Sequence, residues 1–421
     1  MPSRNTHLLR AAFVAPMDGP IIRDGCVAIY GGAIEAVGTC DQLRTWSGDA
    51  PVQDLGDVVL LPGLVNAHTH LELSSVACAE SSYSGTFTDW ILAIRERARF
   101  EPDQLEQSVT VATRSGIEQC LRFGVTCIGD ISQHSQFTRP VLRDSPLRAV
   151  SFGEVLGLGK LRWRFEQLMQ ISLRDEHATP RLRIGLTPHA PYTVDLPGYR
   201  RALELARERD LPLATHLAET REERQFLESQ SGPFRDVWDS LGLWAEPVET
   251  FRGSPIDFAQ VLGLLDEPTL LAHVNDCDDA ELATLARGRA SVVYCPRTHR
   301  YFARAPHRWR QMLEAGINVA VGTDSCASSP DLNLVDELRL LHETAPEIPV
   351  ESLWQMATIR GARALRMEHR IGSISEGKCA DLVAFPATGD DPLRALLESR
   401  DALPHHTWIA GREIQAADQR R

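Results

Sequence analysis

The sequence predicts an α/β fold, a (β/α)8 TIM barrel with a small β-sandwich domain formed by both termini. Strand-like apolar runs recur along the middle of the chain, amphipathic segments separate several of them, and both ends of the chain differ from the middle. Buried apolar strands that alternate with helices are typical of a parallel sheet. The 421 residues suffice for a barrel with additional parts, since one barrel takes about 250 residues.

The predicted barrel strands are short and rich in Val, Ile and Leu. The eight candidates are Leu64–Ala67, Val125–Ile131, Arg148–Val155, Arg183–Thr187, Leu211–Thr215, Thr269–Ala272, Ser291–Tyr294 and Asn318–Val321. Between them, Leu105–Arg122 and Tyr199–Arg209 have the periodicity of amphipathic helices. Units of this kind, repeated over the central region, predict one closed barrel.

Short alternating runs mark both ends of the chain. These runs are Cys26–Tyr30, Ala33–Val37, Ile371–Ile374, Ala380–Phe385 and Thr407–Ile409. Such alternation predicts β-hairpins. We therefore assign residues 1–58 and 370–421 to the small β domain and residues 59–369 to the barrel. Residues 228–268, which are punctuated by Gly and Pro, are predicted to form an elaborated loop after the fifth strand.

Composition and charge disfavour several classes of function. Lys and Arg number 44 and Asp and Glu number 57, and the formal charge of −13 argues against a nucleic-acid or anionic-membrane surface. Nine scattered cysteines without a CxxC pair indicate free thiols in a reducing compartment. No segment resembles a signal peptide or a spanning helix. We expect a cytoplasmic protein that acts on a small molecule.

Polar side chains follow several predicted strands, at the end where barrel enzymes carry their chemistry. The set is His68, His70, His189, His216, Glu219, His273 and Asp324. His68 and His70 lie on one face, because alternate residues of an extended segment point the same way. One histidine at a strand end is weak support for a site. Five of the 14 histidines at the same end of four strands predict a shared site.

Nitrogen and carboxylate ligands without thiolate favour one divalent metal, with zinc first and iron or manganese as alternatives. The predicted ligands are His68, His70, His216 and Asp324. A bound metal lowers the pKa of water towards about 7. Glu219 and His273 then remain as candidates for proton transfer and for orienting that water.

Motifs along nearly the whole chain resemble the amidohydrolase superfamily. The segments concerned are Val59–His70 (VLLPGLVNAHTH), Thr215–Glu219 (THLAE), Leu271–Asp276 (LAHVND), Gly322–Ser325 (GTDS) and Gly372–Phe385 (GSISEGKCADLVAF). Their order is most similar to the single-metal branch, which contains cytosine, guanine and adenosine-type deaminases and triazine hydrolases. Pro188-His189 stands where binuclear relatives carry a carboxylated lysine. The resemblance therefore implies a single metal.

The resemblance also implies roles at the matching positions. The histidines and the aspartate named above become the metal ligands. Asp324 takes a proton from the attacking water, Glu219 protonates a ring nitrogen, His273 hydrogen-bonds the nucleophile and His189 contacts the substrate. The implied reaction is hydrolytic deamination of an aminopurine nucleoside such as adenosine, methylthioadenosine, S-adenosylhomocysteine or aminodeoxyfutalosine. Relatives are commonly oligomeric, so a homodimer is expected.

Two segments depart from the pattern of adenosine-type relatives. Cys295–His299 (CPRTH) replaces a cysteine-proline-x-serine-asparagine motif, and Arg97 and Arg99 fall where those relatives place a carboxylate near the ribose. Gly85–Ile94 (GTFTDWILAI) and His70–Leu73 (HLEL) look more like the aminodeoxyfutalosine deaminases. A nearby arginine is suited to the carboxylate on the tail of their substrate.

The substrate-binding candidates are His189, Glu72, Trp90, Arg297 and Tyr301. Each has a structural alternative. His189 could be a satisfied histidine at a strand end, and Glu72 could cap a loop. Trp90 could belong to the core, and the last two could pack beyond a strand end without contacting a ligand.

Two other functions stay open. The same metal site serves other hydrolases of ring C–N or C–Cl bonds, namely guanine or cytosine deaminases, triazine hydrolases and cyclic amidases. The chain could also be a catalytically inactive metal-binding barrel. The intact set of Glu219, His273 and Asp324 argues against that second alternative.

Overall fold

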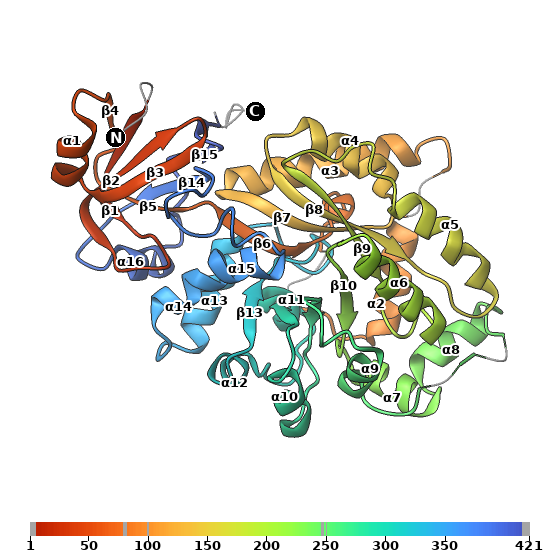
Figure 1. The fold of residues 1–421 in the computed structure, drawn as a ribbon. Helices are drawn as coiled ribbons and strands as arrows, with labels where there is room; N and C mark the ends of the chain where they lie inside the picture. The colour runs from red at the N-terminus through yellow and green to blue at the C-terminus, as the bar shows by residue number, and fades with distance from the viewer. Residues whose placement is uncertain (1–5, 79–81, 99–100, 246–247, 250, 415–421) are drawn as a thin grey trace.

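The computed structural model describes residues 6–414, apart from 79–81, 99–100, 246–247 and 250. Parallel strands and helices alternate through its central part, as the sequence predicts (Figure 1). Two four-stranded parallel sheets have the orders β6-β7-β8-β9 and β10-β11-β12-β13. Their strands are β6 (Leu64–Thr69), β7 (Val125–Ser132), β8 (Arg148–Val155), β9 (Leu182–Pro188), β10 (Ala214–Leu217), β11 (Leu270–His273), β12 (Ser291–Tyr294) and β13 (Asn318–Val321).

Isolated bridges link the ends of these two sheets. The bridged pairs are Thr69 with Asp324 and Leu186 with Leu213. The first junction is supported by two buried hydrogen bonds. The Asn66 side-chain amide donates to Thr323 Oγ1 at 2.7 Å, and the Thr323 backbone N–H donates to Asn66 Oδ1 at 3.1 Å. These contacts hold the carboxyl ends of β6 and β13 together, where the predicted metal ligands lie.

A mixed sheet of eight strands combines both ends of the described chain (Figure 1). Its order is β16-β15-β14-β5-β1-β2-β3, with β4 beside β1. Its strands are β1 (His7–Val14), β2 (Ile22–Tyr30), β3 (Ala33–Thr39), β4 (Val52–Asp54), β5 (Val58–Pro62), β14 (Leu382–Pro386), β15 (His406–Ile409) and β16 (Arg412–Glu413). Strand β5 pairs with β1 and β14 in this sheet, although the predicted domain boundary falls within it.

Helices follow most of the parallel strands. Their bounds are α1 (Cys40–Ser47), α2 (Phe87–Arg97), α3 (Leu105–Arg122), α4 (Ser135–Asp144), α5 (Arg162–Ser172), α6 (Leu196–Glu208), α7 (Arg221–Ser229), α8 (Pro233–Ser240), α9 (Pro255–Leu262), α10 (Asp279–Leu285), α11 (Pro296–Tyr301), α12 (Trp309–Glu314), α13 (Leu334–Thr344), α14 (Val350–Met356), α15 (Ile359–Ala364) and α16 (Pro392–Glu398), with 3-10 turns η1 (Leu71–Leu73) and η2 (Gly159–Leu161). Helix α3 shows why they form: Val109, Ala112, Ile117 and Cys120 are buried at helical spacing.

Several predicted elements match the structure, and two do not. Strands β8, β12 and β13 and helix α3 have the predicted bounds. Residues 371–374 were predicted as a strand but form no strand, since Gly372 has a φ of 89° and turns the backbone. Residues 228–268 contain helices α8 and α9 and are not simply an elaborated loop. The Gly and Pro residues there mark helix ends, as when Pro255 begins α9 and Gly263 ends it in a left-handed conformation.

Among the described residues, no helix has the length and apolar character needed to cross a membrane. The described cysteines all have free thiols, and most of them are buried.

Candidate metal centre and active site

Four histidine rings meet where the parallel strands end. The ring centroid of His68 lies 5.0 Å from that of His70, 5.1 Å from that of His216 and 5.3 Å from that of His273. His70 and His216 direct their Nε2 atoms at each other across 3.3 Å. Two imidazole nitrogens that face one point in this way are suited to a shared cation.

Asp324, which follows the last parallel strand, β13, lies beside these histidines. Its Oδ1 atom lies 3.6 Å from Nε2 of His70 and 3.8 Å from Nε2 of His68. Three sets of side chains have ligand atoms within 4.8 Å of one another among the described residues. They are His68 with His70 and Asp324, His68 with His216 and His273, and His216 with His189 and Glu154. His68 is fully buried, and its ring nitrogens have no hydrogen-bond partner in the described part of the chain.

Hydrogen bonds fix the orientation of two histidines. The Nδ1–H of His216 donates to the His189 carbonyl at 3.1 Å, which leaves the Nε2 lone pair of His216 directed at the cluster. His189 Nδ1 lies 2.7 Å from Thr193 Oγ1, and that hydroxyl donates to the Ala190 carbonyl at 3.1 Å. His189 therefore donates from Nδ1 and keeps Nε2 as an acceptor.

Unusual backbone conformations occur where the site residues leave their strands. His273 has a φ of 77°, Asp324 a φ of 57° and Ala218, beside Glu219, a φ of 51°. Residues other than glycine rarely adopt this left-handed region, and those that do cluster at functional sites. In this protein the conformation occurs where the strands end, and two of the residues that adopt it, His273 and Asp324, are members of the cluster.

Burial sets the charge state of the site. Desolvation lowers the pKa of His216 to about 4 and the pKa of His70 to about 3, so both imidazoles are neutral at neutral pH. Desolvation raises the pKa of Asp324 to about 7. It also raises the pKa of Glu219 to about 8, an effect that nearby Arg304 opposes and Asp324 reinforces. A buried glutamic acid with such a pKa can donate a proton at neutral pH.

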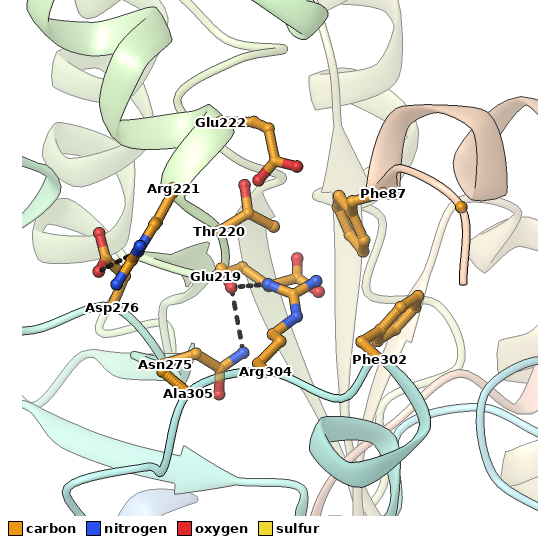
Figure 2. Close-up of a pocket in the computed structure, with 11 residues that line it drawn as sticks. Phe87, Glu219, Thr220, Arg221, Glu222, Asn275, Asp276, Phe302, Arg304 and Ala305 are labelled. Atoms are coloured by element: carbon orange, nitrogen blue, oxygen red, sulfur yellow. Dashed lines mark hydrogen bonds and ion pairs between the residues drawn. The ribbon is translucent and has the colours of Figure 1, made fainter. Parts of the chain in front are cut away.

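Glu219 lines a cavity of about 370 Å³ (Figure 2). Its Oε1 atom is 3.8 Å from Nε2 of His273. Its backbone carbonyl accepts hydrogen bonds from the Asn275 amide, at 3.1 Å, and from the guanidinium of Arg304. Phe87 and Phe302 line the opposite wall, and the Arg304 guanidinium lies 4.9 Å from each of their ring centroids.

The structure brings most of the predicted site residues together. His68, His70, His189, His216, Glu219, His273 and Asp324 all lie in or beside the cluster. The other substrate-binding candidates lie elsewhere. Glu72 is one of them, because its carboxylate accepts hydrogen bonds from the backbone N–H groups of Gln133 and His134 and contacts the His134 ring at 3.1 Å. Glu72 therefore holds the turn after β7.

Arg297 was predicted to contact the substrate, and the structure places its guanidinium in a network of hydrogen bonds within the protein. Its Nε–H donates to Glu337 at 2.6 Å, and its other nitrogens donate to the Asp331 side chain and to the carbonyls of Asp331 and Asn333. The side chain is buried and does not line the cavity. An arginine whose donors are committed in this way joins α11 to α13 and is not free to bind a ligand.

Trp90 and Tyr301, which were also predicted to contact the substrate, pack against other aromatic side chains. Trp90 stacks on Phe87 at 5.7 Å and meets Phe302 edge-on at 5.1 Å, so it supports the cavity wall without lining it. Tyr301 stacks on Tyr83 at 6.1 Å. The Arg97 guanidinium donates to the Ala77 carbonyl at 2.5 Å, and Arg99 lies outside the described residues.

Sequence reasoning missed three residues that surround the site. Arg304 and Asn275 hold the Glu219 backbone, and Glu154 lies 3.9 Å from His189. Glu154 is the second-last residue of β8. A search for polar residues within the last residues of each strand, and not only after them, would have found it. No local pattern singles out Arg304, which comes from a loop after α11.

Comparisons with known proteins identify the family of this chain. The profile of the amidohydrolase family matches residues 59–414. The chain belongs to this family. Its relatives include a 5-methylthioadenosine/S-adenosylhomocysteine deaminase of Moorella thermoacetica, 31% identical over 89% of this chain and 84% of that protein. An aminodeoxyfutalosine deaminase of Deinococcus radiodurans is 27% identical over 81% of each.

A solved structure also resembles this amidohydrolase. It is an adenosine deaminase from Xanthomonas campestris with bound zinc, 25% identical, with a TM-score of 0.79 over 96% of this chain and 92% of that one. The resemblance extends through the parallel strands and the mixed sheet alike, because it covers nearly all of both chains.

Proposed function

We propose that this amidohydrolase is a metal-dependent deaminase that removes the amino group of an aminopurine nucleoside by hydrolysis. The observation that carries the proposal is one constellation: neutral imidazoles and Asp324 converge on a point, and the buried acid Glu219 lies beside it. Membership in the family and the deaminase relatives agree with a hydrolase of carbon–nitrogen bonds.

The residues present fit a single divalent ion. The ligands that we propose are His68, His70, His216 and Asp324. Neutral imidazole nitrogens and a carboxylate oxygen are the donors that zinc prefers, and iron or manganese accept the same set. Both ring nitrogens of His68 are buried without a partner among the described residues, which a bound cation would relieve at Nε2. When bound, the ion supplies Lewis acidity that lowers the pKa of a water molecule.

The protein's own groups then move the protons. Asp324 accepts a proton from the attacking water, and His273 donates a hydrogen bond that orients this water. Glu219 protonates the ring nitrogen beside the carbon that bears the amine, which makes that carbon more electrophilic. The tetrahedral adduct collapses when Asp324 returns its proton to the departing nitrogen, so that the C–N bond breaks and ammonia leaves. The hydroxyl group of the adduct gives its proton to Glu219 as it becomes the carbonyl of the product, which restores the acid. Amines are poor leaving groups until they are protonated, so two carboxyl groups are needed.

An aminopurine nucleoside is the substrate that we propose, with methylthioadenosine, S-adenosylhomocysteine and aminodeoxyfutalosine as the first candidates. Relatives with activities named for these compounds cover most of the chain. The cavity of about 370 Å³ beside Glu219 has the size of a small-molecule site. Its aromatic wall, Phe87 and Phe302, is suited to an apolar or aromatic tail.

We also infer the finer architecture. The bridges of Thr69 with Asp324 and of Leu186 with Leu213 support closure of the eight parallel strands into a barrel. Leu9, Ile29, Leu60, Leu382 and Trp408, from five strands of the mixed sheet, pack into one cluster. This common core supports a sheet that curls into a sandwich. The homodimer and the cytoplasmic location stay predictions.

Ammonia release tests the proposed function. The protein would be loaded with zinc, iron or manganese and offered the three nucleosides together with adenosine, cytosine, guanine and a chlorotriazine. We expect ammonia from a 6-aminopurine nucleoside and loss of that activity after treatment with a chelator. Chloride from the chlorotriazine, or no ammonia from any nucleoside with metal bound stoichiometrically, would overturn the proposal.

A further inference from the structure

A second acidic side chain, Glu154, faces the active site without a role in the proton transfers described above. It lies in β8 opposite Thr187 of β9, and its side chain is 9% exposed. Among the described residues its carboxyl group has no hydrogen-bond partner, and the polar contact it does make, with Nε2 of His189 at 3.9 Å, exceeds hydrogen-bond length. Both groups have unused hydrogen-bonding capacity.

An unpaired carboxyl group in a buried position is costly, because its interactions with water are lost and not replaced. Nearby Glu72 does not compensate for this loss, since its oxygens are occupied by the turn after β7 and it carries the same charge. A ligand with hydroxyl groups would supply what Glu154 lacks. Hydroxyls can donate to its oxygens and accept from its proton, whichever protonation state it has.

The position of Glu154 in the strand order indicates which part of a ligand it would meet. His189 follows β9, and its carbonyl accepts from the backbone N–H of His216 in β10 at 2.9 Å. Glu154 lies in β8 and Glu219 follows the end of β10, so the backbones that carry them are two strands apart, which corresponds to roughly 10 Å across a sheet. In a purine nucleoside the reacting amine and the sugar hydroxyls lie at opposite ends, so a nucleoside can reach from Glu219 to Glu154, whereas a free base is too short.

We propose that Glu154, together with Nε2 of His189, binds the vicinal hydroxyl groups of the ribose and so makes the enzyme specific for ribonucleosides. This inference rests on the proposed function and adds a specificity-determining residue to it. The carboxyl group binds the 2′- and 3′-hydroxyls, and Nε2 of His189 accepts from the hydroxyl beside it. Selectivity then arises because a substrate without these hydroxyls leaves Glu154 buried and unpaired.

The test compares methylthioadenosine with its 2′-deoxy and 3′-deoxy analogues in the wild type, in Glu154→Ala and in Glu154→Gln. We expect the wild type to prefer the ribonucleoside in kcat/KM by at least about tenfold. Glu154→Ala should lower kcat/KM for the ribonucleoside and leave the deoxy analogues unchanged, so that the preference disappears, and Glu154→Gln should restore part of it. Glu166→Ala, at an exposed position of α5, is the control. A preference that persists in Glu154→Ala would overturn the inference.

Two further measurements separate this inference from its alternatives. Calorimetry with purine riboside, which lacks the amine, and with its 2′-deoxy analogue reports binding without turnover. Hydroxyl-dependent binding that Glu154→Ala removes would support the inference even if no deamination occurred, a result that would refute the proposed function alone. Glu154, His189 and His216 could also hold a cation. Two metal ions per chain in the wild type and one in Glu154→Ala would refute the inference in favour of a second metal site.

Discussion

The carboxylate of Asp324 lies 3.6 Å from Nε2 of His70, and these two residues follow the last and the first strand of the parallel set. The contact exists because the backbone N–H of Asp324 donates to the His68 carbonyl at 3.1 Å, and Thr69 Oγ1 donates to the Asp324 carbonyl at 2.9 Å. The candidate metal centre therefore depends on the junction between the two parallel sheets.

Replacement of His70 by glutamine should abolish stoichiometric zinc binding, because it removes one of the two imidazole nitrogens that face each other across 3.3 Å. At a zinc concentration of 100 times Kd, binding should stabilise the wild type by about 2.7 kcal/mol and the variant by almost nothing. Metal analysis and thermal unfolding with and without zinc would measure this. The exposed His405→Gln variant is the control. Equal zinc content in His70→Gln and the wild type would refute the ligand assignment.

Replacement of Glu219 by glutamine should lower kcat by about 10²–10⁴-fold, the usual contribution of a general acid. The amide is almost isosteric but cannot transfer the proton. Metal content should be unchanged, and KM should change little. Steady-state ammonia release would report the rate, and Glu228→Gln, at the exposed end of α7, is the matched control. Undiminished turnover in Glu219→Gln would exclude the proton-donor role.

Arg297 should contribute to stability and not directly to binding. Replacement by methionine leaves the fully buried Glu337 without its partner and should cost about 3–5 kcal/mol of unfolding free energy. Arg310→Met removes an exposed ion pair with Glu347 and should cost at most about 1 kcal/mol. Urea unfolding of both variants would measure the difference. If Arg297→Met instead unfolds like the wild type but has a higher KM, the substrate-binding role predicted from sequence is correct.

Buried histidines should make the metal-free protein sensitive to acid. Desolvation lowers the pKa of His307 to about 3 from an ordinary value of 6.5, so the unfolded chain binds the proton more readily. Stability from this group is complete above about pH 6.5 and declines as the pH falls towards the folded-state pKa, by up to about 1.4 kcal/mol per pH unit. His307→Gln should reduce that slope in urea unfolding, and His405→Gln should not. An identical slope in all three proteins would contradict the expectation.

Sequence predicted the elements that carry their own pattern. The bounds of β8 and α3 were predicted correctly because each has a local pattern. Strand β8 is buried on both faces and is therefore a continuous run of residues suited to the core, whereas α3 is buried on one face and shows helical periodicity. The histidine cluster was predicted from the polar residues that follow the strands, because the carboxyl ends of parallel strands meet at one end of a barrel. Strand β10 begins at Ala214, three residues after its predicted start at Leu211, because an apolar run does not show where hydrogen bonding to its neighbour begins.

Contacts between distant segments could not be predicted in this way. Arg297 and Tyr301 lie beyond a strand end. Only the packing of α11 against α13 shows that Arg297 forms an ion pair with Glu337. Glu72 looked like a residue of the pocket until its partner, the turn at His134, was known. Arg304 reaches Glu219 from a loop whose sequence has no catalytic pattern.

The most direct test of the central claim is the deamination of methylthioadenosine, S-adenosylhomocysteine and aminodeoxyfutalosine by the metal-loaded enzyme in water enriched in heavy oxygen. The account predicts one ammonia released per nucleoside converted and one heavy oxygen atom incorporated at the purine carbon that carried the amine, with neither observed after chelation. Unchanged nucleosides, or ammonia without the oxygen label in the product, would contradict it.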